Sequence, residues 1–61
     1  MSDVPPLGSH ELVEHRAFLV CHNADLWLED PSELNTGKLR EATRAWLDAQ
    51  EAWRQAMRET V

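Results

Sequence analysis

The sequence predicts an all-α fold, an antiparallel hairpin of two long amphipathic helices with a short helical turn between them. Three observations indicate this fold. Apolar residues recur three and four positions apart on both sides of residue 30, which is the period of a helix. The second half is rich in Ala, Leu, Arg, Glu and Gln, all strong helix formers. No segment alternates apolar and polar residues as a half-buried strand does.

The first helix is expected to begin at Ser9 or His10 and to end near Leu28. Residues 1–8 include two prolines and a glycine, so we expect a flexible N-terminal arm followed by a single domain over residues 9–61. Ser9 is a good N-cap, and Glu11 in the first turn suits the positive end of the helix dipole.

The second helix is expected to begin after a tight turn. Asp30 is the predicted N-cap of that turn, with Pro31 at the first helical position and Glu33 completing a capping box. Because Asn35-Thr36-Gly37 can end a helical turn, we interpret residues 31–36 as a separate turn. The helix itself then runs from Thr36 or Lys38 to Glu59.

The apolar faces favour a dimer. The second helix carries a stripe of large residues beside a seam of alanines spaced 3, 4, 3 and 4 apart: Leu39, Trp46, Trp53 and Met57, then Ala42, Ala45, Ala49, Ala52 and Ala56. The first helix carries two apolar stripes, and its neighbour in the hairpin can cover only one fully. The leftover row is Leu12, Leu19 and Leu26. We therefore expect two hairpins to form a four-helix bundle.

Size and composition support association. A chain of 61 residues buries only about 60% of its unfolded surface, and its single cysteine, Cys21, excludes an intrachain disulfide. No apolar run is long enough to span a membrane and no signal peptide is evident, so we expect a cytoplasmic protein. Arg outnumbers Lys five to one, a bias typical of GC-rich coding, which suggests a bacterial or phage source.

Charge is unevenly distributed. The net charge is −5, with −6 in residues 1–33 and +1 in residues 34–61. We expect a small acidic protein that acts as a non-enzymatic interaction module, a regulator, adaptor or inhibitor that docks on a larger protein. The candidate interface residues are apolar and lie on both helices: Leu12, Leu19, Leu26, Trp27, Leu28 and Leu47.

Two alternatives remain open. Arg40, Arg44, Arg54 and Arg58 share the outer face of the second helix, interrupted by Leu47 and Glu51. A dimer would double this stripe, and a Rop-like regulator of structured RNA is a possible use, by analogy of size and architecture alone. The net negative charge opposes general nucleic-acid binding.

Metal binding is the second alternative. His15 and His22 share a face of the first helix with several carboxylates, a donor set that suits a divalent ion. Such a mixture usually forms a solvated surface, so no metal ligand is assigned. The sequence contains no phosphate-binding loop or nucleophile elbow, and Cys21 and His22 point about 100° apart in a helix. We therefore expect neither enzymatic activity nor a cofactor.

Overall fold

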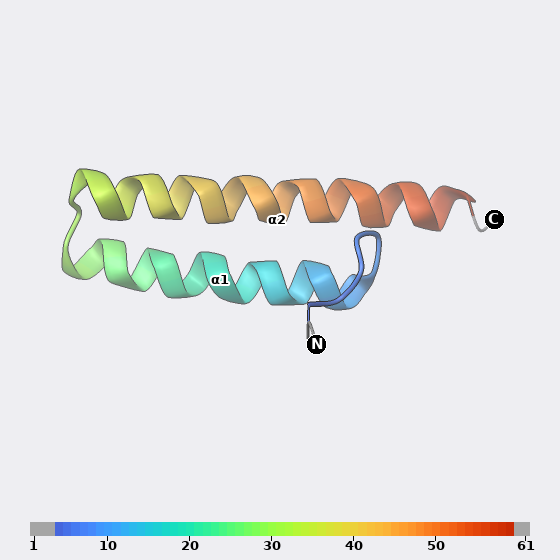
Figure 1. Cartoon of the computed structure of the whole chain (residues 1–61), viewed down its shortest axis with the longest axis horizontal. Coiled ribbons are helices and arrows are strands. Elements are labelled where there is room, and N and C mark those ends of the chain that lie inside the picture. The colour runs from blue at the N-terminus through green and yellow to red at the C-terminus, as the bar shows by residue number, and fades with distance from the viewer. Residues whose placement is uncertain (1–3, 60–61) are drawn as a thin grey trace.

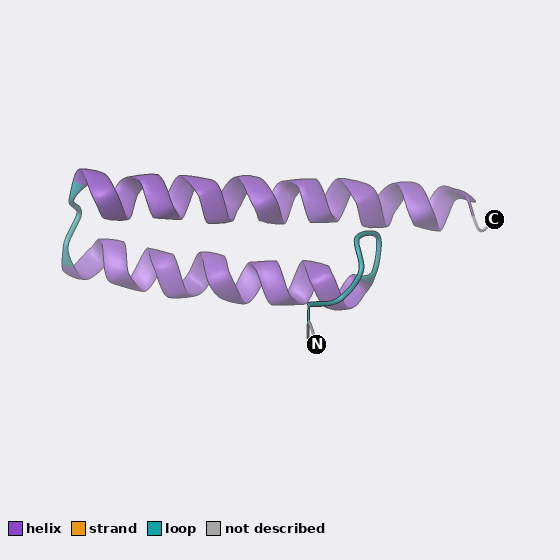
Figure 2. Ribbon diagram, in the orientation of Figure 1, coloured by secondary structure: helices purple, strands orange, loops and turns teal. Residues whose placement is uncertain are grey.

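The protein is a hairpin of two antiparallel helices, as the sequence predicts. The computed structural model describes residues 4–59. Helix α1 spans His10–Glu29 and helix α2 spans Glu33–Glu59, and the two lie side by side along almost the whole of α1 (Figure 1). Loops occur only at the N-terminal turn and at the connection (Figure 2), and residues 4–59 contain no strand. The all-α helical hairpin is therefore confirmed. Its pairing into a four-helix bundle stays a prediction.

The start of α1 follows the predicted cap. The backbone N–H of Leu12 donates to the Ser9 hydroxyl oxygen over 3.2 Å, which satisfies one of the free donors at the helix N-terminus. The same hydroxyl donates to the Pro6 carbonyl at 2.7 Å. Ser9 thus both caps the helix and closes the turn before it.

The connection corrects the predicted capping box. The Asp30 backbone N–H donates to the Leu26 carbonyl at 3.0 Å, so Asp30 closes α1 instead of opening α2. The residue that accepts at the start of α2 is Ser32, whose hydroxyl receives the Asn35 N–H over 3.2 Å. The cap lies two residues later than predicted because Asp30 already closes α1, and Ser32 offers the same capping chemistry.

The second helix is continuous from its first turn. Its helical residues begin at Glu33, and it runs through Gly37 without a break, so residues 33–36 belong to α2 and do not form a separate turn. Gly37 has no positive φ and therefore does not act as a left-handed cap. A glycine inside a helix costs only about 1 kcal/mol, which the packing of a long helix can offset.

The N-terminal segment folds back onto α2. With seven more residues, α2 is about 10 Å longer than α1, and the turn before Ser9 covers part of this overhang (Figure 1). Gly8 adopts φ 96°, and a Cβ there would lie 3.8 Å from the Cβ of Ala56. Residues 4–8 of the predicted arm are thus a turn against α2, while residues 1–3 lie outside the described residues.

The core is small and lies toward the open end of the hairpin. Leu12 and Val13 of α1 and Ala49 of α2 are buried, and Trp46 and Trp53 pack against them. The indole of Trp53 also meets the His10 ring, with centroids 5.1 Å apart. Since Ala49 occupies little space, the two helices approach closely while the tryptophans fill the space beside it.

The hairpin is a single layer. It measures 44 × 26 × 13 Å, and its thickness is close to the diameter of one helix with side chains. Domains ordinarily bury a core between two packed layers. Both broad faces of this layer are consequently open to solvent or to another molecule.

The uninterrupted start of α2 can be tested at Gly37. Gly37→Ala should raise the free energy of unfolding by about 1 kcal/mol, because a Cβ there would meet nothing within 4 Å. Gly8→Ala is the opposite control and should destabilise the hairpin, since an alanine at φ 96° is strained. Urea denaturation followed by circular dichroism measures both changes. Destabilisation by Gly37→Ala would contradict the assigned start of α2.

Candidate interaction surface

The two broad faces of the hairpin differ in charge. On one, the leucine side, a shallow groove of about 390 Å³ runs between the helices. The residues that line the groove include both signs of charge: Arg16, Leu19, Asn23, Lys38, Glu41, Ala42 and Ala45. On a helix, Leu12 and Leu26 lie in line with Leu19 at seven-residue intervals. The predicted leucine row therefore belongs to this side.

The hairpin itself buries part of the leucine row. Leu12 is only 4% exposed and belongs to the hairpin core, which corrects the expectation that one neighbouring helix leaves the whole row uncovered. Leu19 is half-buried, and Leu26 is exposed at the closed end of the hairpin. The gradient follows the packing, because α2 and the N-terminal turn cover the open end more completely. Leu12 is therefore not available to a partner of the folded hairpin.

Helical periodicity places no charged residue along most of the opposite side, and Glu14, seven positions before Cys21, joins it at the open end. We name it the uncharged face, and its residues are Ala17, Cys21, Ala24 and Leu28 of α1 with Leu39, Thr43, Trp46 and Gln50 of α2. A hollow of about 130 Å³ opens between the helices here, lined by Ala17, Val20, Cys21 and Trp46. The indole nitrogen of Trp46 is buried without a hydrogen-bond partner among the described residues. Leu28, one of the predicted interface residues, is 73% exposed on this face.

Cys21 differs from expectation. Its position in an apolar stripe suggests a small buried residue, yet the thiol-bearing side chain is exposed. The reason is that α2 lies over the neighbouring Val20, and Cys21 is turned about 100° from it. Cys21 therefore occupies the open part of the uncharged face.

Trp27 is held by the hairpin itself. Its indole N–H donates to the Thr36 hydroxyl oxygen at 2.9 Å, and that hydroxyl donates to the Ser32 carbonyl at 2.8 Å. The side chain is half-buried. Although predicted as an interface residue, Trp27 joins the end of α1 to the start of α2.

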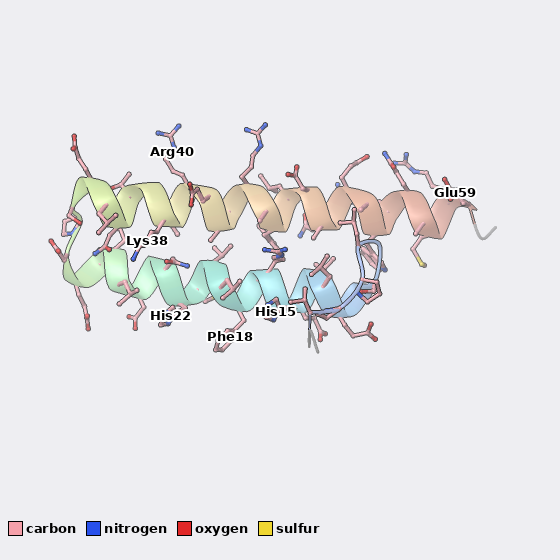
Figure 3. The ribbon with its side chains drawn as sticks, in the orientation of Figure 1. His15, Phe18, His22, Lys38, Arg40 and Glu59 are labelled. Atoms are coloured by element: carbon pink, nitrogen blue, oxygen red, sulfur yellow. The ribbon has the colours of Figure 1, made fainter. Side chains whose placement is uncertain are left out.

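The predicted arginine stripe lies on the outer face of α2. Arg40, Arg44, Arg54 and Arg58 are all exposed, and Figure 3 shows Arg40 pointing away from α1. Leu47, at 50% exposure, interrupts the stripe. Glu51 also interrupts it and lies 3.9 Å from the Arg54 guanidinium. The stripe is therefore a mixture of cations, an acid and an apolar residue.

Several exposed apolar residues are absent from the predicted interface, and Phe18 is the one in the middle of α1. Phe18 is 71% exposed and projects from α1 on the side away from α2 (Figure 3). Glu11 and Asp25 lie seven positions before and after it, which places the three residues in one line along the helix. That spacing is the signal in the sequence that could have indicated a partly apolar outer row.

The histidines do not converge. His15 and His22 are both exposed on α1, and residues 4–59 contain no group of three His, Cys, Asp or Glu side chains that could hold a metal ion. A third histidine, His10, forms an ion pair with Glu14 at 3.5 Å. Nothing in this arrangement favours the metal-binding alternative.

Comparison with protein-family models, with curated proteins and with solved structures gives no match for this chain. Within residues 4–59, neither helix combines the length and the apolar character needed to cross a bilayer. The function must therefore be argued from the surface of the hairpin.

The structural role of Trp27 gives a direct test. Thr36→Val keeps the shape of the side chain but removes the acceptor of the indole N–H, so it should lower the free energy of unfolding by about 1 kcal/mol. Thr43→Val is the matched control, because within residues 4–59 the Thr43 hydroxyl bonds the Leu39 carbonyl of its own helix. Both variants are compared at the same low protein concentration, because Thr43 lies on the uncharged face. Thermal denaturation compares the two variants. Equal stabilities would contradict the proposed link between the helices.

Proposed function

We propose that this chain is a non-enzymatic protein–protein interaction module that works as a homodimeric bundle of helices, a small cytoplasmic regulator, adaptor or inhibitor. The observation that carries this proposal is the single layer of helices with large apolar side chains exposed on it. Phe18, Leu28 and Leu47 are each at least half exposed, and a single layer leaves such side chains without the second layer that ordinarily covers them. A second layer would complete the core.

The accessible surface area of the chain also supports association. The accessible surface of the chain is 4952 Å², whereas a compact monomer of the same mass exposes about 4,000 Å². The excess is close to the roughly 800 Å² that each partner buries in a stable protein interface. One partner of similar size would bring the exposed surface per chain to that of a compact protein.

Structured RNA is the second candidate partner. In its favour, Arg40, Arg44 and Arg58 are exposed and form no ion pair within the described part of the chain. Against it, Glu41 and Asp48 line the same shallow groove as Arg40 and Arg44, and acids beside the arginines weaken attraction to phosphates. A gel shift at low salt that is lost in Arg40→Ala would favour RNA over protein.

The proposal predicts a concentration-dependent dimer. Sedimentation equilibrium should give about twice the 7.0 kDa of one chain, and dilution should lower the melting temperature, because association stabilises only the folded chain. The helical signal should fall together with the mass if the second layer completes the core. A constant mass of one chain at high micromolar concentration, with an unchanged melting temperature, would reject the dimer.

A further inference from the structure

We propose that the uncharged face is the surface through which two copies of this chain pair, with α1 of each copy lying against α2 of the other. This inference rests on the proposed function and extends it by naming the face, the partner and their relative orientation. The charge of the two faces, two rows of residues beside the uncharged face and the register of the helices support this pairing.

The two broad faces differ in the cost of covering them. The uncharged face presents alanine, cysteine, leucine, threonine, tryptophan and glutamine side chains along most of its length. Glu14, seven positions before Cys21, is the acid on this side of α1 and pairs with His10 at 3.5 Å, so covering the face removes few charges from water. The leucine side includes Arg16, Lys38 and Glu41 in its groove, and removing unpaired charges from water is costly. Pairing through the uncharged face is therefore the less costly choice.

Two rows of complementary chemistry flank the uncharged face. The acidic row runs along α1 and consists of Glu11, Phe18 and Asp25. The basic row runs along α2 and consists of Arg40, Leu47 and Arg54. In each row the residues are seven apart, so each forms one line along its helix, with an apolar residue between two like charges. All six side chains are exposed.

Both rows adjoin the uncharged face. Phe18 lies one helical turn from Cys21, and Leu47 lies one turn from Thr43. Arg40 and Leu47 also line one shallow groove together with Arg44 and with Leu39 and Thr43 of the uncharged face. Each row is therefore an outer border of that face.

The register of the hairpin sets the level of each residue along the long axis. His10 meets Trp53 at the open end, and Trp27 meets Thr36 at the closed end. In both pairs the two residue numbers add up to 63. Because both helices are regular, any two residues of α1 and α2 whose numbers add up to about 63 lie at the same height along the hairpin. Each acidic-row residue therefore lies within about two residues of the level of one basic-row residue. The matched levels are Glu11 with Arg54, Phe18 with Leu47, and Asp25 with Arg40.

Within one chain these residues cannot meet, because the rows lie on opposite outer edges of the hairpin. A two-fold axis parallel to the helices brings them together. It places the uncharged faces of two copies against each other and sets α1 opposite α2 of the second copy. Each residue keeps its height along the helix axis in this rotation. Asp25 then faces Arg40 of the second copy, and Phe18 faces Leu47 of the second copy. A two-fold interface repeats each contact, so the dimer contains two full sets.

Other arrangements of two copies would place like charges against each other, or leucines against carboxylates. A two-fold axis perpendicular to the helices would set α1 against α1, and the acidic row would face the acidic row. Pairing through the leucine side would bring Leu19 and Leu26 toward the edge of α2 that carries Glu41 and Asp48. Like charges facing each other are destabilising, and so are unpaired buried carboxylates.

The orientation is tested by exchanging charges. Arg40→Glu should raise the dissociation constant of the dimer about tenfold, because it replaces two exposed attractions with two repulsions. Asp25→Arg combined with Arg40→Glu should restore the dissociation constant to within about threefold of the unmodified chain. Arg44→Glu is the matched control, since it makes the same charge change one turn away, on the line of Glu51 and Arg58. Sedimentation equilibrium of the full chain measures all four proteins.

The face is tested by two leucines at the closed end of the hairpin. Leu28 is 73% exposed on the uncharged face, and Leu34 is 68% exposed one turn before Lys38 on the leucine side. Leu28→Glu should abolish the dimer and Leu34→Glu should preserve it. Circular dichroism at high concentration checks that both variants remain helical.

The single cysteine supplies a measurement that needs no substitution. Cys21 is exposed in the hairpin but lies inside the proposed interface. Its alkylation by iodoacetamide should therefore slow as the protein concentration rises through the dissociation constant. In Leu28→Glu the rate should stay fast at every concentration.

The outcomes separate the two proposals. A dimer that survives Leu28→Glu, or that Leu34→Glu disrupts equally, overturns the uncharged face but leaves the dimeric module intact. A dimer in which the double charge exchange is no better than Arg40→Glu overturns the orientation. A chain that remains monomeric throughout, with fast alkylation of Cys21, overturns the proposed dimer as well.

Discussion

The register between the two helices is the constraint on which the rest of the structure depends. Contacts at both ends fix it: the Trp53 indole against the His10 ring and the Trp27 indole on the Thr36 hydroxyl. A shift of α2 by one residue would turn every side chain by about 100° and remove Ala49 from the space opposite Leu12 and Val13. Because the buried core is so small, there is little other packing to hold the helices in place.

Local rules in the sequence predict much of the fold. The start of α1 and its Ser9 cap follow from propensity and capping chemistry. The start of α2 does not, since Asp30 and Ser32 are both good caps and each is followed by plausible first-turn residues. The structure uses Ser32 because Asp30 already closes α1, with its backbone N–H on the Leu26 carbonyl. No pattern near residue 30 contains that information.

The interaction surface is harder to predict, because periodicity assigns a residue to a stripe but not to a depth. Leu12 and Val13 fall on different stripes of α1, yet both are buried. The cause lies in the other helix, where Ala49 leaves room for α2 to settle between the two stripes. Leu26 belongs to the same row as Leu12 but is exposed. At the closed end, no further segment of residues 4–59 lies over the hairpin as the N-terminal turn does at the open end. Depth is thus set by the small residues of the opposing helix.

The uneven distribution of charge along the chain acquires a physical role in the proposed dimer. Within one hairpin, the acids of α1 and the arginines of α2 point outward on opposite edges, so their attraction contributes little to folding. Between two copies, the same charges lie on facing edges at matched levels. Attraction at the border of an apolar face selects orientation more than it adds affinity. The uncharged face would therefore supply the driving force for pairing, and the flanking rows would determine that α1 meets α2 and not another α1.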